Sequence, residues 1–170
     1  ERVYLTLEEV RAMAAWECRY QVLKRAFLFS CLTGLRKSDI EKMTWREVRQ
    51  EGDFTRIVFR QKKTDGQEYL DINPQAVQYL GERGSDDDKV FKGFYYSSYV
   101  LVELKSWAVR CGITKPITFH SGRHTFATLM LYLGTDLFTV QKLLGHKEVK
   151  TTLVYAHIMD KKKQEAVSKI

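Results

Sequence analysis

A histidine and an arginine, His120 and Arg123, form the first pair of side chains in this sequence that could act on one ligand. Residues three apart on a helix share a face, so the imidazole and the guanidinium can converge on a single group. The arginine fork matches the non-bridging oxygens of a phosphate, and a helix start adds backbone amides and a favourable dipole. The pair indicates a phosphate site, although taken alone such spacing is more often an ordinary solvated helix start.

Arg36 is a second candidate ligand for the same phosphate. It follows Gly34, the glycine expected to end an apolar helix, where a surface arginine could simply neutralise the helix C-terminus. Asp39, three residues further on, is expected to pair with this guanidinium and to fix its direction. An arginine held in this way is a better phosphate ligand than a loose one.

Lys63 offers a proton donor. It immediately precedes the Asp-Gly turn of a hairpin that is predicted from residues 54–60 and 68–72. The hairpin tip could deliver the ammonium to a bound substrate, where it would protonate a departing oxygen. Most hairpin-tip lysines are simply solvated, and the neighbouring Lys62 is an alternative donor.

Tyr155, nine residues after His146, could be a nucleophile. One tyrosine among nine is normally a packing residue. A phenol with a pKa near 10 is ionised in roughly one molecule per thousand at neutral pH, so a reactive tyrosine needs positive charge or a base beside it. The charge is available from four side chains if the fold brings them together: Arg36, His120, Arg123 and His146.

The elements that must hold these residues in place are mostly helices. Capping residues and terminating glycines predict helices over residues 6–18, 20–33, 73–80, 97–110, 120–133, 136–144, 149–158 and 160–170. Two capping-box spacings, Ser38 with Glu41 and Thr44 with Glu47, predict two short helical pieces between residues 38 and 48. With the hairpin, the expected fold class is mainly α with a small antiparallel β-sheet, an α+β domain.

The composition fits one basic, globular domain. The 170 residues carry 28 Lys+Arg against 21 Asp+Glu, a formal charge of +7, and 44% of them are hydrophobic. A chain of this size buries roughly 70% of its unfolded surface, so it needs no disulfide or structural metal. The positive charge suits nucleic acid, as it would in any nucleic-acid-binding protein. Candidate contacts to a nucleic-acid backbone are Lys24, Arg25, Lys42, Lys105, Arg110, Lys115 and Lys142.

Several classes of protein are excluded. The three cysteines lie far apart without zinc-site spacing, so we expect reduced, buried thiols and a cytoplasmic protein. No apolar run approaches the roughly 18 residues of a membrane span. The carboxylates of residues 86–88 have no histidine partners, so we expect a solvated loop there, no metal site and no cofactor.

Because the first residue is not Met, we expect the chain to be a fragment.

Five motifs follow one another in a set order. They are Thr33-Gly34-Leu35-Arg36, Lys63-Thr64 after a strand, residues 118–128 with the His-x-x-Arg pair, Leu144-Gly145-His146, and Thr151-Thr152-x-x-Tyr155. In this order and spacing they resemble the catalytic domain of the tyrosine recombinases, the phage-type integrase family of site-specific DNA recombinases. The similarity runs from about Leu5 to Ile158. It implies the tyrosine recombinase catalytic-domain fold.

The resemblance assigns a phosphate-binding role to several residues. Arg36 and Arg123 match the two arginines that grip the scissile phosphate. Asp39 falls where the family commonly has an acidic residue that supports the first of these arginines. His120 begins the His-x-x-Arg motif, and His146 matches the later histidine or tryptophan that donates to the same phosphate.

The resemblance also implies the reaction. Tyr155 matches the nucleophile, and Lys63 matches the general acid for the 5′-hydroxyl leaving group. Attack on a DNA phosphodiester would give a 3′-phosphotyrosyl bond and a free 5′-hydroxyl, and a 5′-hydroxyl from another strand would reverse the step. Because the covalent bond stores the energy and the cations stabilise the transition state, neither ATP nor a metal ion is expected to be needed.

Two positions depart from the family's pattern. Ser121-Gly122 replaces bulkier apolar residues, so the start of that helix is expected to be looser. Asp65 separates Lys63-Thr64 from the glycine of the turn, so the turn is expected to be one residue longer.

The function implied by the resemblance is site-specific recombination by an integrase of a bacterial mobile element. Its partner would be double-stranded DNA, bound by a homotetramer in the full-length protein, whereas this chain alone is expected to be monomeric. Residues 1–160 would form the catalytic domain, and residues 161–170 a C-terminal tail that packs on a neighbouring protomer. Two alternatives stay open: a type IB topoisomerase-like enzyme and a non-catalytic DNA-binding regulator with this fold.

Overall fold

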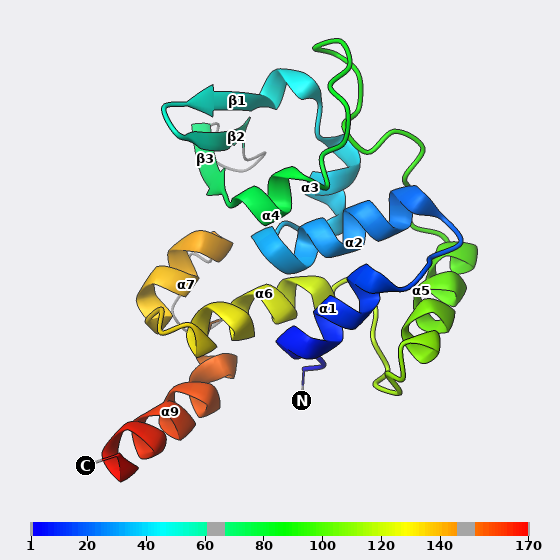
Figure 1. Ribbon diagram of the computed structural model, residues 1–170. Helices are drawn as coiled ribbons and strands as arrows, with labels where there is room; N and C mark the ends of the chain where they lie inside the picture. The colour runs from blue at the N-terminus through cyan, green and yellow to red at the C-terminus, as the bar shows by residue number, and fades with distance from the viewer. Residues whose placement is uncertain (1, 61–66, 146–151, 170) are drawn as a thin grey trace.

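The computed structural model describes residues 2–60, 67–145 and 152–169, and helices dominate them. A three-stranded antiparallel sheet, in the order β1-β2-β3, lies at one side, and the last helix projects away from the other elements (Figure 1). The α-helices are α1 (Leu7–Ala15), α2 (Gln21–Thr33), α3 (Lys37–Lys42), α4 (Pro74–Val77), α5 (Ser98–Arg110), α6 (Ser121–Tyr132), α7 (Leu137–Leu144) and α9 (Ala156–Ser168). The 3-10 helices are η1 (Trp45–Glu47) and η2 (Leu153–Tyr155), and the strands are β1 (Val48–Glu51), β2 (Phe54–Arg60) and β3 (Gln67–Ile72). The expected α+β class is confirmed.

Four of the described α-helices start where the sequence places capping residues. The Thr6 hydroxyl accepts a hydrogen bond from the Glu9 amide (3.2 Å), and the Glu9 carboxylate accepts one from the Thr6 amide (2.9 Å). Asn73, Ser97 and Asp136 cap α4, α5 and α7 through side-chain oxygens. These local signals predict the helix starts well because each cap satisfies backbone amides that have no partner within the helix.

One predicted helix start is wrong. α3 begins one residue before Ser38, so the expected capping box of Ser38 with Glu41 lies inside the helix, and Arg36 occupies the N-cap position. The second box is confirmed, because the Thr44 amide donates to the Glu47 carboxylate (3.0 Å), although the element it opens is a 3-10 helix.

Helix ends differ more from expectation than helix starts. α1 and α4 end early, at Ala15 and Val77, and the chain turns to extended backbone at Trp16 (φ −91°, ψ 150°). The helix expected over residues 149–158 is represented in the described residues by η2 and the start of α9. α9 continues to Ser168, so the tail is helical as expected.

The predicted hairpin is present as β2 and β3, and β1 is an additional strand. β1 pairs with the other edge of β2, with Val48 opposite Ile57. Only Val48 of its four residues is buried, so no alternation of apolar and polar residues marks β1 in the sequence. The hairpin turn, with its expected extra residue, lies outside the described residues.

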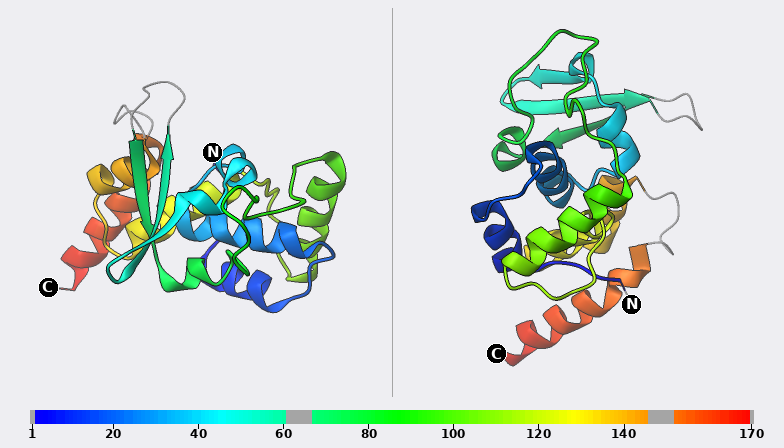
Figure 2. Two further views of the ribbon diagram at one scale, coloured as in Figure 1. Left: turned by 90° about the horizontal axis from the view of Figure 1, so that it is seen from above. Right: turned by 90° about the vertical axis from the view of Figure 1, so that its right-hand side faces the viewer.

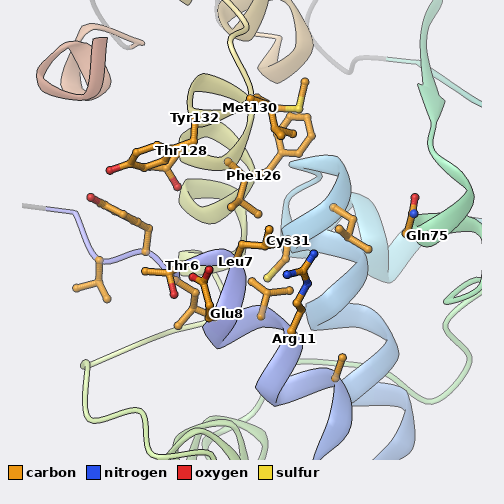
Figure 3. Close-up of a pocket in the computed structure, with 18 of the residues that line it drawn as sticks. Thr6, Leu7, Glu8, Arg11, Cys31, Gln75, Phe126, Thr128, Met130 and Tyr132 are labelled. Atoms are coloured by element: carbon orange, nitrogen blue, oxygen red, sulfur yellow. The ribbon is translucent and has the colours of Figure 1, made fainter. Parts of the chain in front are cut away.

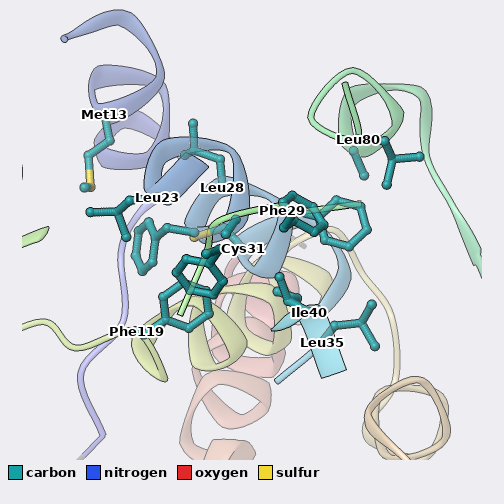
Figure 4. Packing of buried hydrophobic residues seen from close by; sticks show 14 of the residues in the cluster. Met13, Leu23, Leu28, Phe29, Cys31, Leu35, Ile40, Leu80 and Phe119 are labelled. Atoms are coloured by element: carbon teal, nitrogen blue, oxygen red, sulfur yellow. The ribbon is translucent and has the colours of Figure 1, made fainter. Parts of the chain in front are cut away.

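α2 lies at the centre of the main hydrophobic core and packs against α6 (Figure 4). The Phe27 ring of α2 meets Trp107 of α5 and Phe119 edge to face, with centroid separations of 6.0 and 5.8 Å. All three aromatic side chains are buried, so they fix α5 and the chain before α6 against α2. This packing positions His120, the residue after Phe119.

The start of α6 is tight, so the expectation of a looser helix start is wrong. Ser121 and Gly122 are both buried. A Cβ at Gly122 would lie 2.9 Å from the Ser30 hydroxyl oxygen and 3.0 Å from the Ser30 Cβ on α2. The small residues allow the two helix backbones to approach closely, and the approaching helix fills the space that a bulkier side chain would occupy.

A second, smaller hydrophobic cluster joins the other end of α6 to α7, η2 and α9. It includes Phe126, Leu131, Val140, Tyr155 and Ile158. The ring of Tyr155 is therefore a packing element as well as part of a candidate nucleophile.

The cysteines are free thiols, and in the described residues no helix combines the length and apolar character needed to cross a bilayer. Cys18 and Cys31 are buried as expected, whereas Cys111 is partly exposed. Burial raises the pKa of the Cys18 thiol to about 11 and also raises the pKa of Cys31, so both are protonated at neutral pH.

Gly34→Ala is expected to destabilise the fold more than Gly112→Ala. Both glycines have left-handed backbones (φ 78° and 80°), so alanine costs each position roughly 1–2 kcal/mol. A Cβ at Gly34 would also lie 2.6 Å from the Phe126 ring and 2.9 Å from Leu144, whereas nothing lies within 4 Å of one at Gly112. We expect overpacking to add about 1–3 kcal/mol at Gly34 alone, measured as the free energy of unfolding in urea. Equal losses in the two variants would show that close packing at Gly34 is unimportant.

Candidate active site

Arg123 is the most firmly anchored of the predicted site residues. Its side chain is 6% exposed and donates from Nη1 to the Gly34 carbonyl (2.7 Å) and from Nη2 to the Leu144 carbonyl (2.6 Å). These carbonyls lie at the C-terminal ends of α2 and α7, where carbonyls lack helical partners and the helix dipole is negative. Left-handed glycines, Gly34 and Gly145, end both helices as the sequence predicts. One buried cation therefore joins three motifs that are far apart in the sequence.

Burial and neighbouring charge set the ionisation of Arg123. Desolvation, followed by the charge of Arg36, lowers the pKa of its guanidinium to about 10, while Tyr155 and Asp39 act in the opposite direction. The side chain is still a cation at neutral pH. A guanidinium has five N–H donors, and the two carbonyls use two of them, so Arg123 can bind an anion while it is held in place.

Arg36 lies on the exposed side of the same site. Its backbone is extended at the N-cap position of α3 (φ −75°, ψ 157°). Asp39 pairs with Lys42 instead (3.8 Å between Oδ1 and Nζ), so the expected pair of Arg36 with Asp39 is wrong. Asp39 and Lys42 lie three residues apart within α3, so helical spacing brings this second pair together. Within the described part of the chain Arg36 makes no hydrogen bond or ion pair, so it is available to an anionic ligand.

His120 precedes α6 and is exposed beside the two arginines. Its ring lies edge to face with that of His124, with a centroid separation of 4.6 Å. Desolvation, together with the charges of three nearby arginines of which Arg123 has the largest effect, lowers the pKa of His120. The neutral imidazole retains one N–H donor for a ligand.

Tyr155 lies on the buried side of the site. Its side chain is 3% exposed, and the phenolic oxygen lies 2.5 Å from Nδ1 of His124. Burial raises the pKa of Tyr155, while the charges of Arg2 and Arg123 act in the opposite direction. In this state the phenol is un-ionised and shielded from solvent, although it lies within the electrostatic influence of Arg123.

His124 is a site residue that the sequence analysis does not single out. It is 8% exposed and contacts Tyr155 through Nδ1 and Arg2 through Nε2, at 3.5 Å from the guanidinium nitrogen. Desolvation, followed by the charge of His120 and of nearby arginines, lowers its pKa to about 4, so the imidazole is neutral at pH 7. A signal was present in the sequence, since His120 and His124 are four residues apart and face the same side of α6.

Two predicted site residues, Lys63 and His146, lie outside the described residues. The structure brings Arg36, His120, Arg123 and Tyr155 together, close enough that their charges influence the pKa values of neighbouring groups in the set. The result is one cationic cluster, exposed at Arg36 and buried at Tyr155.

Four of the seven cations considered as nucleic-acid contacts serve the fold. Arg25 donates to three backbone carbonyls between residues 79 and 90. Arg110 and Lys115 form ion pairs with carboxylates at 2.8 and 2.6 Å, and Lys24 donates to a backbone carbonyl (2.7 Å). Their positions are explained without a nucleic-acid ligand.

An apolar groove of ≈ 1260 Å³ lies between the N-terminal segment, α1, α2 and α6 (Figure 3). Its lining includes Leu7, Cys31, Phe126 and Met130, and Arg2, which contacts His124, also borders it. Apolar walls do not suit a phosphate, so the groove is not the candidate active site. Across the described ranges, no group of three or more His, Cys, Asp or Glu side chains could hold a metal ion.

This chain belongs to the phage integrase family, which matches residues 4–162. A tyrosine recombinase of Pseudothermotoga lettingae is 26% identical to it over 98% of this chain. The chain spans 60% of that relative's length. The resemblance expected from the five motifs is therefore confirmed.

Solved structures share the fold. The crystal structure of XerA recombinase has a TM-score of 0.77 and 25% sequence identity, and the match covers 98% of this chain and 63% of that one. The Tn1549 transposon integrase, solved in complex with transposon right end DNA, has a TM-score of 0.66 and 18% identity, with 91% of this chain and 61% of that one covered. The expected catalytic-domain fold is confirmed.

Arg123→Met is expected to lower the free energy of unfolding by about 2–4 kcal/mol. The variant leaves the Gly34 and Leu144 carbonyls without their buried donor. Arg36→Met makes the same chemical change at an exposed side chain and is expected to stay within about 0.5 kcal/mol of the wild type. Urea denaturation of both variants measures the difference. Similar stabilities would show that Arg123 does not anchor the two helix ends.

Acid is expected to destabilise the fold partly through His124. The pKa of this residue is about 4 in the folded chain against an ordinary 6.5. The unfolded state therefore binds more protons in this window, and the free energy of unfolding falls as the pH is lowered from 6.5 to 4. Between about pH 7 and pH 4.5 we expect the wild type to lose roughly 2 kcal/mol more of its free energy of unfolding than His124→Asn does. Urea denaturation of both proteins at the two pH values measures this difference. The same pH dependence in both proteins would contradict the lowered pKa.

Proposed function

We propose that this chain is the catalytic domain of a site-specific DNA recombinase and that it cleaves and rejoins strands through Tyr155. The observation that carries the proposal is the placement of a buried, firmly held Arg123 beside Tyr155, with Arg36 exposed at the same cluster. A phosphodiester has the negative charge and the oxygen acceptors that such a cluster binds best. Membership of the phage integrase family supports the same chemistry.

In the proposed reaction the phenolic proton of Tyr155 passes to water, the Tyr155 oxygen forms a bond to phosphorus, and the bond to the 5′ oxygen breaks. Negative charge gathers on the equatorial oxygens, where Arg36 and Arg123 would stabilise it and His120 would donate a hydrogen bond. Arg123 is already fixed by two carbonyls, so it needs no reorganisation during the step. Tyr155, at 3% exposure, has to move outward before it can attack.

The remaining roles follow the family resemblance. Lys63 would protonate the departing 5′ oxygen, and His146 would donate to the same phosphate. A 5′-hydroxyl from another strand would then attack the phosphotyrosyl bond and release Tyr155. Asp39 would act on Arg123 through its charge, since it raises the pKa of that guanidinium, rather than by pairing with Arg36.

We propose double-stranded DNA as the partner. The transposon integrase was solved with DNA, and the formal charge of +7 supports an anionic partner here. Cations that bind phosphates release counterions, so affinity should fall steeply with salt. Because the chain spans 60% of the length of its Pseudothermotoga relative, full activity is proposed for the longer protein.

The proposed assembly is a tetramer on DNA, with residues 1–160 as the catalytic domain and residues 161–170 in a tail that docks on a neighbour. α9 runs through this boundary and projects away from the other elements (Figures 1 and 2). Val167 near its end is 69% exposed. An exposed apolar side chain on a projecting helix supports docking, and without DNA the chain would be a monomer.

The proposed biological role is integration of a mobile element. The fold shared with a transposon integrase supports this choice. A topoisomerase-like enzyme would instead relax supercoiled plasmid without exchanging strands, and a DNA-binding regulator would form no covalent complex.

Tyr155→Phe is expected to abolish covalent capture of DNA. The wild type, incubated with nicked duplexes that lose a short 5′-hydroxyl fragment after cleavage, should form an adduct that survives denaturation. The phenylalanine variant lacks only the attacking oxygen, whereas Tyr95→Phe changes a tyrosine that is 72% exposed and should retain the wild-type yield. Excess chelator should leave the yield unchanged, because cationic side chains are proposed to do the work of a metal. Denaturing gels measure the adduct.

A pool of nicked duplexes with randomised sequence serves as the substrate, so that sequencing the captured DNA gives the cleavage position. An adduct in Tyr155→Phe would identify a different nucleophile. Loss of the wild-type adduct in chelator would contradict the metal-free mechanism. Plasmid relaxation without strand exchange would favour the topoisomerase-like alternative.

A further inference from the structure

The contact between His124 and Tyr155 determines where the phenolic oxygen rests. The two side chains are 8% and 3% exposed, and the oxygen lies 2.5 Å from Nδ1. Apolar neighbours in the second cluster hold the tyrosine ring, while the imidazole supplies the hydrogen bond to its polar end. A buried hydroxyl needs such a partner, because leaving it unsatisfied is unfavourable.

Arg2 determines which imidazole nitrogen carries the proton. A guanidinium has no acceptor, so the contact of Arg2 with Nε2 of His124 (3.5 Å) favours a lone pair on Nε2. A neutral imidazole with a lone pair on Nε2 carries its proton on Nδ1. His120 and Arg123 on the same side of α6 disfavour a second proton on this ring. His124 is therefore the donor, and the Tyr155 oxygen accepts.

We propose that His124 is a positioning residue for the nucleophile: its Nδ1–H donates to the Tyr155 oxygen and keeps the phenol in a buried resting position until the site opens around DNA. The inference rests on the proposed function only in treating Tyr155 as the nucleophile. Because Arg2 precedes α1, the N-terminal segment contacts the nucleophile through a single imidazole.

Two substitutions separate the hydrogen bond from the filling of space. His124→Asn can place an amide N–H near the position of Nδ1, whereas His124→Leu fills a similar volume without a donor. Acetylation of tyrosines by N-acetylimidazole, read by peptide mass spectrometry on the folded chain without DNA, reports exposure of each hydroxyl. Tyr95 and Tyr99, at 72% and 78% exposure, serve as internal references.

Tyr155 is expected to react at least about tenfold faster in His124→Leu than in the wild type, because an unpartnered phenol leaves its buried position. In His124→Asn the rate should stay within about threefold of the wild type, since the donor is restored. A Tyr155 that stays equally protected in His124→Leu would overturn the positioning role.

Nitrogen-15 NMR of the histidine rings tests the proton's location directly. The signals of His124 are identified by their absence in His124→Asn. We expect a protonated Nδ1 and an unprotonated Nε2 in the wild type, and a larger fraction with the proton on Nε2 in Arg2→Ala. A wild-type proton on Nε2 would overturn the assignment of His124 as the donor.

Neither measurement requires DNA cleavage, so the inference and the proposed function can fail separately. A protected Tyr155 with the expected tautomer, combined with no wild-type adduct, would reject the function alone. If His124→Leu does not fold, the partly buried Tyr96 will also react fast. The tautomer of His124 in the wild type and in Arg2→Ala then decides.

Discussion

A buried cation that is compensated by helix ends, rather than by a carboxylate, is the interaction on which the site depends. Arg123 donates to the last carbonyls of α2 and α7, so both helices must end at one point, and left-handed glycines make those ends possible. A carboxylate would cancel the charge of the guanidinium, whereas carbonyl dipoles stabilise it and leave the full charge for a ligand. The lowered pKa of Arg123 shows that this compensation is incomplete. A phosphate would supply the missing negative charge, so the fold itself creates the demand for an anion.

The same excess of positive charge would control Tyr155, the proposed nucleophile. Without an anion, burial and the charge of Arg36 disfavour the charged form of Arg123, and the histidines beside it stay neutral. Burial keeps the phenol of Tyr155 protonated, whereas nearby arginines favour its ionised form. Moving the phenol out of the apolar cluster toward the arginines would remove the effect of burial and strengthen the effect of the positive charge, so the pKa of Tyr155 would fall. For the proposed nucleophile, reactivity would thereby depend on position, and the buried resting state would limit unproductive chemistry.

The sequence predicted what depends on local backbone chemistry. The sequence predicts the helix starts at Thr6 and Asn73 and the helix end at Gly34. Each depends only on hydrogen bonds of backbone groups within a few residues. The family motifs identified the residues of the cluster. What could not be predicted depends on contacts between distant segments: the burial of Arg123, the tight approach at Gly122, and β1, which has a single buried residue. Spacing predicts a pair of Asp39 with Arg36, but Lys42 lies equally far along the chain within α3, and Asp39 pairs with that lysine. His124 was overlooked because its importance depends on Tyr155, 31 residues further along the chain.

The two halves of the site differ in how firmly they are held, and this difference indicates which half moves. Arg123 lies within α6, whose first eight residues are all buried, and two helix ends grip its side chain. Tyr155 ends a three-residue 3-10 helix whose other members, Leu153 and Val154, are 51% and 42% exposed. Displacing Arg123 would disrupt the crossing of α2 with α6, whereas displacing Tyr155 breaks one side-chain hydrogen bond and part of a small apolar cluster. Since less buried contact opposes the second movement, DNA binding is expected to leave the arginine in place and bring the tyrosine to it.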